Sequence, residues 1–410
     1  MSDPAELPRP PAFPWAPKGF GGLSPSVDGD AVRYRSPFTG ASIEREEAAD
    51  ILANWRRTTE ANHAITVACG MAWWKRERIA QFLWAEGRDP LIFEEDADRA
   101  VARAANGRIA VWPARMPAGL AEKAVDRLVR IEDGFIRSIG LGADLHPPLS
   151  IVVDQKGIYY DPTRPSDLET ILESADFTPS LLARAERLIE TIVTRGISKY
   201  ASEPPAITGQ PRTRRTILVA GQVEDDMSVM LGGAGIHSNL ELLRRARKAE
   251  PDAHILFKPH PDVDAGHRLG RVPDAELRDH ADEIVRGEAM PSLLARVDAV
   301  HVLTSLTGFE ALLRGLEVIV HGHPFFAGWG LTRDLAGPLP RRTRILTLAE
   351  LVAGALILYP RYLDPVTELP CPPEILLQRF AGGWRPRTSW LIRVRRWQGR
   401  FARLLGTVSR

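Results

Sequence analysis

Short apolar segments alternate with helical patterns twice along the chain, and this alternation constrains the fold most strongly. In the first half, strand and helix patterns follow one another at 64–69, 73–84, 90–93, 96–105, 108–112 and 128–131. In the second half they follow at 216–220, 238–250, 254–258, 290–296 and 298–303. Strands that alternate with helices in this way predict mainly parallel sheets with helices on both faces.

The two halves are separated by residues 201–215, which contain three prolines, no apolar periodicity and a basic end. Such a composition is typical of a linker. We therefore predict an α/β fold in which two Rossmann-like domains, 61–200 and 216–383, face a central cleft. Residues 1–60, rich in Pro and Gly and then helical over 43–58, are expected to form a lead-in and a small appendage.

Composition excludes several classes of protein. The net charge of the 410 residues is +1, which argues against nucleic-acid binding. Cys69 and Cys371 have no metal-ligand spacing and make no disulfide framework. No signal-peptide pattern and no apolar run of roughly 18 residues is visible. These features predict a cytoplasmic protein.

The C-terminal segment 384–410 contains eight arginines and no acidic residue. Arranged as a helix, it places its tryptophans and aliphatic residues on one stripe and arginines around much of the rest. This pattern predicts an amphipathic tail on an anionic membrane surface. The alternative is a terminal helix docked on its own domain with solvated arginines.

Two acidic loops follow predicted strands. Glu132 and Asp133 end the strand of the first half at 128–131, and Glu224, Asp225 and Asp226 follow the strand at 216–220. Carboxylates that face each other across a cleft are what glycosyl transfer requires. The alternative for the second loop is an acidic cluster that stabilises a helix N-terminus. No Cys/His cluster or H-E-x-x-H motif is present, so we expect no metal site.

Two further loops could hold an anion. In the segment 258–262, prolines stiffen the backbone around Lys258 and His260, which suits a phosphate or carboxylate; the alternative is a structural turn with His260 bonded to backbone. The turn Thr304–Gly308 precedes a helix whose first-turn amides could bind phosphate. Glu310 could accept hydrogen bonds from sugar hydroxyls, or could form a capping box with Thr307.

Seven segments between about 128 and 335 together resemble the KpsC-type capsule polysaccharide biosynthesis proteins. They are EDGFIRSIGLG (132–142), PLSIVVDQKGIYYDPTRPSDLE (148–169), SKY (198–200), GQVEDDMS (221–228), KPHPDV (258–263), TSLTGFEALLRG (304–315) and PFFAGWGLTRD (324–334). The resemblance implies a GT-B-like retaining glycosyltransferase that transfers β-linked Kdo (3-deoxy-D-manno-oct-2-ulosonic acid) from CMP-Kdo onto a lipid-linked oligo-Kdo acceptor. Many members carry two such modules in tandem, whereas this chain has the length of one.

The resemblance also implies roles for individual residues. Asp226 would be the nucleophile, with Asp225 as the competing choice, and Glu132 or Asp133 would be the base for the acceptor. The second domain would bind CMP-Kdo. The donor-binding residues would be Lys258, His260, Thr304, Ser305, Thr307, Gly308, Glu310, Trp329 and Gly330. Apart from the resemblance, five arginines in or near these loops could clamp carboxylate or phosphate groups of the acceptor or donor: Arg137, Arg333, Arg341, Arg342 and Arg344.

The expected partners are CMP-Kdo, a lipid-linked Kdo acceptor, the inner-membrane surface through the basic tail, and other capsule assembly proteins. No cofactor is expected, because the leaving group is a nucleoside monophosphate with no diphosphate to demand a metal. Two alternatives stay open. One is a transferase for another CMP-linked keto-acid sugar, and the other is a non-catalytic capsule assembly or export subunit.

Overall fold

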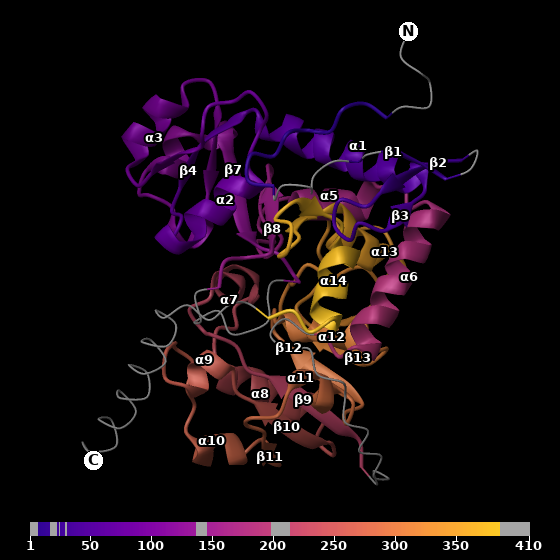
Figure 1. Ribbon diagram of the computed structural model, residues 1–410. Coiled ribbons are helices and arrows are strands. Elements are labelled where there is room, and N and C mark those ends of the chain that lie inside the picture. The colour runs from indigo at the N-terminus through magenta and orange to yellow at the C-terminus, as the bar shows by residue number, and fades with distance from the viewer. Residues whose placement is uncertain are drawn as a thin grey trace, which may run out of the picture.

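The structure is a computed structural model that describes residues 7–16, 23, 25–28, 31–136, 146–197 and 214–385. The chain forms two α/β halves, drawn one above the other in Figure 1. The predicted linker up to residue 213, Arg137 and the basic tail from residue 386 onward lie outside the described residues.

The sheet of the first half has the described strand order β16-β15-β8-β7-β6-β4-β5. Its strands are β4 (Ile65–Cys69), β5 (Ile92–Glu94), β6 (Arg108–Val111), β7 (Leu128–Asp133), β8 (Ser150–Asp154), β15 (Pro360–Leu363) and β16 (Pro370–Cys371). The pairs among β4 to β7 are parallel, as predicted, whereas β8 and β15 join in antiparallel register. The apolar runs of β4, β6 and β7 are buried between the helices, as expected for parallel strands covered on both faces.

Helices cover both faces of this first sheet. The helices of the first half are α1 (Arg45–Asn62), α2 (Arg76–Phe82), α3 (Ala97–Ala104), α4 (Leu120–Lys123), α5 (Asp167–Ser174) and α6 (Pro179–Thr194), with 3₁₀ turns η1 (Trp73–Lys75), η2 (Pro113–Arg115) and η3 (Val125–Arg127). Helix α2 packs on one face of the sheet, and helices α3 and α4 pack on the other. The predicted helix at 43–58 is α1, which buries Ile51, Leu52 and Trp55. The predicted lead-in also contains a small antiparallel sheet of β1 (Pro25–Asp28), β2 (Ala31–Arg35) and β3 (Ser42–Ile43).

The sheet of the second half is parallel, with the described order β11-β10-β9-β12-β13-β14. Its strands are β9 (Thr216–Ala220), β10 (His254–Lys258), β11 (Glu283–Ile284), β12 (Ala299–Val302), β13 (Glu317–Val320) and β14 (Arg333–Asp334). This is the Rossmann order, and its topological switch point lies between β9 and β12. Ligands bind outside the carboxyl ends of strands at such a point.

The helices of the second half are short apart from α8. They are α7 (Met227–Gly232), α8 (Asn239–Ala249), α9 (Pro261–Asp264), α10 (Asp274–Arg278), α11 (Met290–Leu294) and α12 (Leu306–Leu312). The predicted helix at 238–250 is α8, which buries Leu242, Leu243 and Ala246 against the sheet. The loop before α7 and the loop before α12 leave the two strands that flank the switch point.

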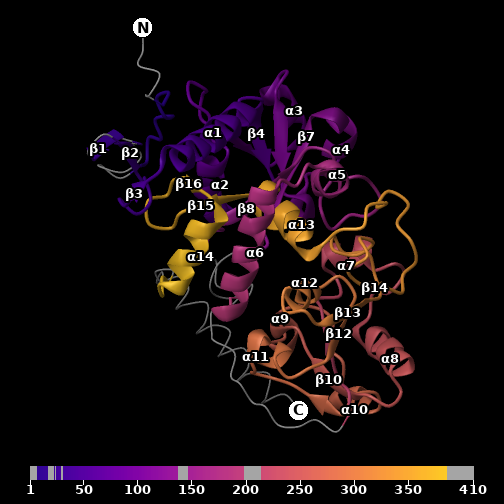
Figure 2. The same ribbon diagram turned by 90° about the vertical axis from the view of Figure 1, so that its right-hand side faces the viewer.

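The last part of the chain returns to the first half, so the predicted second domain at 216–383 is too long. Its elements are α13 (Leu348–Val352), the π-helix η5 (Ala353–Leu358), β15, β16 and α14 (Pro373–Ala381). Strand β15 pairs with β8, and Figure 2 shows α13 and α14 beside α6. The Trp55 indole donates to the carbonyl of Pro370 at 2.6 Å. Strand β15 pairs with a sheet edge that is distant in the chain, and local sequence patterns carry no signal for such pairing.

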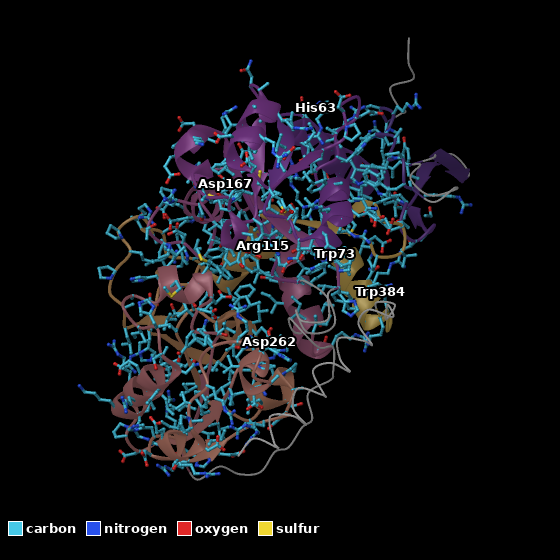
Figure 3. All side chains as sticks on the ribbon, turned by 90° about the vertical axis from the view of Figure 1, so that its left-hand side faces the viewer. His63, Trp73, Arg115, Asp167, Asp262 and Trp384 are labelled. Carbon is cyan, nitrogen blue, oxygen red and sulfur yellow. The ribbon has the colours of Figure 1, made fainter. Side chains whose placement is uncertain are left out.

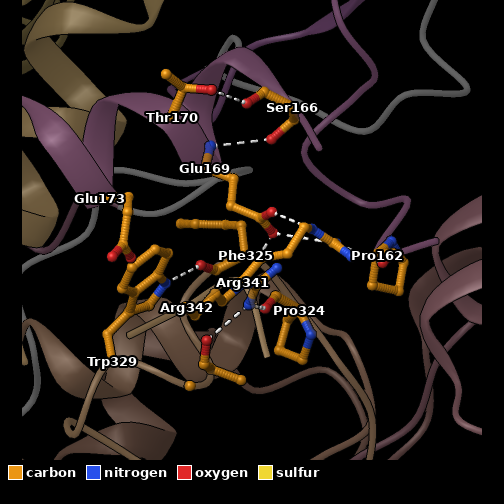
Figure 4. A network of polar contacts seen from close by, with 12 residues as sticks. Pro162, Ser166, Glu169, Thr170, Glu173, Pro324, Phe325, Trp329, Arg341 and Arg342 are labelled. Atoms are coloured by element: carbon orange, nitrogen blue, oxygen red, sulfur yellow. Dashed lines mark hydrogen bonds and ion pairs between the residues drawn. The ribbon is translucent and has the colours of Figure 1, made fainter. Parts of the chain in front are cut away.

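The two halves meet through aromatic rings and one buried ion-pair cluster. Phe135, which follows β7, stacks on Phe325 of the second half with ring centroids 4.4 Å apart. Figure 4 shows Glu169 of α5 facing Arg341 and Arg342, at 2.6 and 3.1 Å from their Nε atoms. These contacts hold the loops after β7 and β13 against each other.

Candidate active site

The acidic loop after β9 places Asp226 at the start of α7. Its Oδ1 accepts from the Ser228 backbone N–H at 2.9 Å and from the Ser228 hydroxyl at 2.7 Å. Asp226 is therefore the N-cap of α7, which matches the alternative role considered for the acidic loop. Capping does not consume the carboxylate, because its second oxygen stays available to another partner.

A chain of side-chain contacts joins Asp226 to the end of β12. The Ser228 hydroxyl lies 3.3 Å from the hydroxyl of Thr304. Gln222 bonds both polar groups of Thr304. Its Nε2 donates to the Thr304 hydroxyl at 2.8 Å, and its Oε1 accepts from the Thr304 N–H at 2.8 Å. The loops on both sides of the switch point thus position Asp226. Sequence reasoning missed Gln222, although it directly follows the β9 run in the segment 221–228.

The other two acids of this loop point elsewhere. Glu224 accepts from the Asn239 N–H at 2.7 Å and so supports the start of α8. Asp225 is exposed and pairs with Arg268 at 3.0 Å. Both line a pocket of about 500 Å³ whose lining does not include Asp226. Of the three acids, only Asp226 is bonded towards β12.

The carboxylates of the first half lie at the end of β7. Asp133 pairs with Lys75 of η1 at 3.0 Å, and Glu132 Oε1 accepts from the Asp133 N–H at 3.0 Å. Lys75 is 6% exposed, and its ammonium lies 3.5 Å from the ring centroid of Trp112. Asp133 is therefore committed to a buried cation, which makes it the less suitable of the two acids to act as a base.

Tyr160 lies near both acidic loops, and no hydrogen-bond partner of its buried hydroxyl is found among the described residues. Burial and then the negative charges of Glu132 and Asp226 raise the pKa of its hydroxyl. Loss of solvation and then the charges of Glu132, Tyr160 and Asp226 also raise the pKa of Tyr159. The backbone confirms the proximity, because a Cβ on Gly232 of α7 would lie 3.3 Å from the Tyr160 carbonyl. Sequence reasoning did not select these tyrosines, although both lie in the segment 148–169.

Lys258 and His260 follow β10 as predicted, but both have partners within the chain. The Lys258 ammonium donates to the carbonyl of Glu288 at 2.7 Å, and burial lowers its pKa. His260 caps α9, where its Nδ1 accepts from the Asp262 N–H at 3.2 Å. This is the structural turn considered as the alternative. Because Nδ1 accepts, a neutral His260 carries its proton on Nε2.

Helix α12 begins at Leu306, inside the turn that was expected to precede it. Ser305 is the N-cap, and its hydroxyl oxygen accepts from the Thr307 N–H at 3.2 Å. The Gly308 N–H donates to the Ser305 carbonyl at 3.0 Å. The capping box of Thr307 with Glu310, considered as the alternative, is therefore wrong. Glu310 lies in the second turn and is only 7% exposed.

The loop after β13 is also built differently from the expectation. Trp329 is fully buried, and its indole donates to the Phe325 carbonyl at 2.8 Å. The guanidinium of Arg342 lies 5.6 Å from the Trp329 ring centroid. Gly330 has φ +80° and lies against Ile345. The positive φ that this turn requires therefore accounts for the glycine. The Trp329 side chain was expected to contact the donor. This expectation is wrong, because the indole is buried in the core.

Arginines expected near the ligand instead serve the interface. Arg341 and Arg342 bind Glu169, and Arg344 binds Glu350 at 2.9 Å. Within the described ranges, no group of three or more His, Cys, Asp or Glu side chains is arranged to hold a metal ion. In the same ranges, no helix has the length and apolarity of a membrane span.

Comparison with known proteins relates the chain to capsule biosynthesis. The family described as "Capsule polysaccharide biosynthesis protein" matches residues 108–362. The capsule polysaccharide modification protein LipA of Neisseria meningitidis serogroup A is 40% identical over 338 residues, which make up 82% of this chain and 48% of LipA. The lipopolysaccharide-processing protein LpsZ of Rhizobium meliloti is 46% identical over 239 residues, 57% of this chain and 54% of LpsZ. The chain thus spans about half the length of these curated relatives.

Two solved structures of KpsC from Thermosulfurimonas dismutans have the same fold. The one described as a beta Kdo 2,7 transferase is 35% identical with a TM-score of 0.63, and the match covers 77% of this chain and 98% of that one. The one described as a beta Kdo 2,4 transferase is 34% identical with a TM-score of 0.66, and the match covers 79% and 100%. The predicted α/β fold is therefore confirmed.

Proposed function

Because the chain belongs to the family of capsule polysaccharide biosynthesis proteins and is of KpsC type, we propose that it is a β-Kdo transferase. The donor is CMP-Kdo, the acceptor is a lipid-linked glycan that ends in Kdo, and the anomeric configuration is retained. One observation carries this proposal most directly. Asp226 lies at the switch point between β9 and β12, where the Ser228 hydroxyl donates to it at 2.7 Å and lies 3.3 Å from the hydroxyl of Thr304.

In the first step, a carboxylate oxygen of Asp226 attacks the anomeric carbon of Kdo. The bond from that carbon to the CMP phosphate oxygen breaks, and CMP leaves with the bonding electron pair. The hydrogen bonds from Ser228 orient Asp226 for this attack. The Kdo unit is then held by an ester bond to Asp226.

In the second step, the acceptor hydroxyl attacks the same carbon and the ester bond to Asp226 breaks. Glu132 takes the hydroxyl proton as general base. Two displacements at one carbon restore the original configuration. Asp133 positions rather than reacts, because Lys75 already neutralises it.

The donor phosphate lies at the switch point between β9 and β12. His260 Nε2–H faces the donor anion as a hydrogen-bond donor, since its Nδ1 is held by Asp262. Ser305 and Thr304 contribute hydroxyls at the start of α12. Gly330 keeps the loop after β13 close to the donor. Thr307, Gly308 and Glu310 are buried in α12 and support the donor-binding start of this helix from inside the domain.

The test is transfer from CMP-Kdo, generated in situ, to a synthetic lipid acceptor that ends in Kdo, with NMR of the anomeric linkage. Asp226→Asn keeps a side chain that can cap α7, so the protein should fold while transfer falls by about a thousandfold or more. Asp225→Asn is the matched control and should retain transfer, because its carboxylate pairs with exposed Arg268. In Glu132→Gln, mass spectrometry should detect Kdo on Asp226.

Undiminished transfer by Asp226→Asn would overturn the assignment of the nucleophile. Consumption of another CMP-linked keto-acid in place of CMP-Kdo would move the protein to a different donor. Absence of transfer with every Kdo-terminated acceptor would favour a non-catalytic capsule assembly or export subunit.

A further inference from the structure

The first half has a topological switch point of its own, and none of the residues discussed for the reaction lies on its two loops apart from Lys75. Strand β5 lies on one side of β4 and strand β6 on the other. The loops that leave the carboxyl ends of β4 and β6 therefore diverge, and such a divergence makes a binding site in open α/β sheets. Strand β7, which ends in Glu132, is the next neighbour of β6.

The loop after β4 presents an exposed indole from a fixed turn. Trp73 is 68% exposed, although a tryptophan side chain gains free energy from burial. Two residues later in the same 3₁₀ turn, buried Lys75 is bound to Asp133 at 3.0 Å and to the face of Trp112. The turn is thus anchored to the acidic end of β7, while Trp73 projects away from the core.

The loop after β6 presents a cation next to this turn. Gly70 has φ +70°, and a Cβ there would lie 2.5 Å from the Arg115 carbonyl, so the two loops touch. Arg115 is exposed, and no partner of its guanidinium is seen in the part of the chain that the structure describes. Nearby Arg76 and Arg103, in contrast, form ion pairs with Glu95 and Glu94. Figure 3 places Trp73 and Arg115 at the edge of the first half that faces Asp262 of the second half.

We propose that Trp73 and Arg115 form the subsite for the terminal sugar acid of the acceptor. The C–H face of the sugar ring packs on the indole, and the sugar carboxylate pairs with the planar guanidinium. A sugar held at the ends of β4 and β6 presents its hydroxyl towards Glu132 on the adjacent strand. This inference rests on the proposed function, because it assigns the acceptor end of the same reaction.

The test measures binding of a lipid-free Kdo disaccharide by titration calorimetry, in the absence of donor. Trp73→Ala should weaken binding by about tenfold, and Trp73→Phe should recover most of the loss. Arg115→Gln should weaken binding of the disaccharide by about tenfold but have little effect on its methyl ester, which lacks the charge. Val125→Ala and Arg187→Gln, which change exposed side chains outside both loops, are the matched controls.

Transfer kinetics separate this inference from the proposed function. With active wild-type protein, Trp73→Ala should raise the acceptor KM by about tenfold with a change of less than about twofold in the KM for CMP-Kdo. Wild-type protein that binds the disaccharide but transfers nothing would uphold the subsite and reject the proposed function. An unchanged acceptor affinity in Trp73→Ala would overturn the subsite. So would a loss confined to vesicles of anionic phospholipid, which would assign Trp73 to a membrane surface.

Discussion

Arg342 donates from its Nε to the Glu169 carboxylate at 3.1 Å, and this buried pair joins the second half of the chain to helix α5 of the first. The Arg342 Nη1 also donates to the carbonyls of Pro324 and Ala327, at 2.7 and 2.6 Å. The arginine therefore organises the loop after β13, and Glu169 compensates its charge. Burial lowers the pKa of Arg342, and the nearby carboxylate of Glu169 opposes this shift.

Replacement of Glu169 by Gln should destabilise the protein by about 3 kcal/mol. The guanidinium of Arg342 would stay buried without its counter-charge, and an uncompensated buried charge is costly. Urea unfolding followed by circular dichroism measures the loss. The control is Glu374→Gln, whose carboxylate pairs with Arg184 at 2.9 Å with side chains 33% and 37% exposed. That change should cost less than about 1 kcal/mol. Equal effects of the two substitutions would contradict a structural role for the buried pair.

Replacement of Gln222 by Leu should lower transfer activity more than it lowers stability. The Thr304 N–H would lose its acceptor, at a cost of about 1 to 3 kcal/mol. The link from β12 to Ser228 and Asp226 would loosen, and displaced reacting groups reduce the rate by about tenfold to a hundredfold. Measuring both kcat and the midpoint of thermal unfolding for this variant separates the effect on activity from the effect on stability. Gln155→Leu, at an exposed position, should change neither. Wild-type kcat in Gln222→Leu would show that this link does not position Asp226.

The buried pair of His301 and His321 should make stability fall as the pH falls below about 6.5. Their ring nitrogens lie 3.0 Å apart. Burial, followed by the effects of His321 and nearby arginines, lowers the pKa of His301 to about 3, and burial with nearby arginines lowers that of His321 to about 4. The unfolded chain therefore binds more protons than the folded protein between pH 6.5 and 4. Each histidine should reduce the free energy of unfolding by about 2 kcal/mol between pH 8 and pH 5.

Replacement of His321 by Gln should flatten this dependence, because one titrating group is removed. The measurement is the free energy of unfolding in urea at several pH values. Exposed His63→Gln is the control and should leave the slope unchanged. A slope in His321→Gln as steep as that of the wild type would assign the acid sensitivity to other groups.

Both cysteines should resist thiol reagents in the folded protein. Cys69 and Cys371 are free and buried. Burial, followed by the charge of Glu94, raises the pKa of Cys69 to about 11, and burial also raises that of Cys371. The thiolate is the reactive form, so its scarcity and its inaccessibility act together. Ellman's reagent should detect almost no thiol before urea is added and both thiols afterwards. Rapid native labelling would show that one of the two strands that carry them opens readily.

Local patterns predicted the elements that flank both switch points. The apolar runs at β4, β6, β7, β9, β10 and β12 were expected as strands and are buried as such. Helices α1 and α8 were also expected, since their apolar residues recur at helical spacing. Parallel strands that are buried on both faces need apolar runs whichever strand they pair with. Such strands can therefore be predicted without knowing their partners. The start of α12 was placed too late, because Ser305 and Thr307 are equally plausible caps in a sequence.

Roles that depend on partners distant in the chain were harder to predict. Lys258 was expected to face an anion, but it donates to the carbonyl of Glu288. Trp329 was expected beside the donor, but it fills the core behind Phe325. Side-chain type restricts what a residue can bind and does not say which group will be in reach.

By itself, the sequence determined the alternation of strands and helices, the acidic loops at the ends of β7 and β9, and the likeness to KpsC-type proteins. These follow from local periodicity and from ordered motifs, which neighbouring residues carry. The tertiary structure decided that the chain after β14 returns to the first sheet, that Asp226 rather than Asp225 is bonded towards β12, and that Glu169 holds Arg342. Each of these depends on hydrogen bonds or ion pairs that form only after distant segments have packed together.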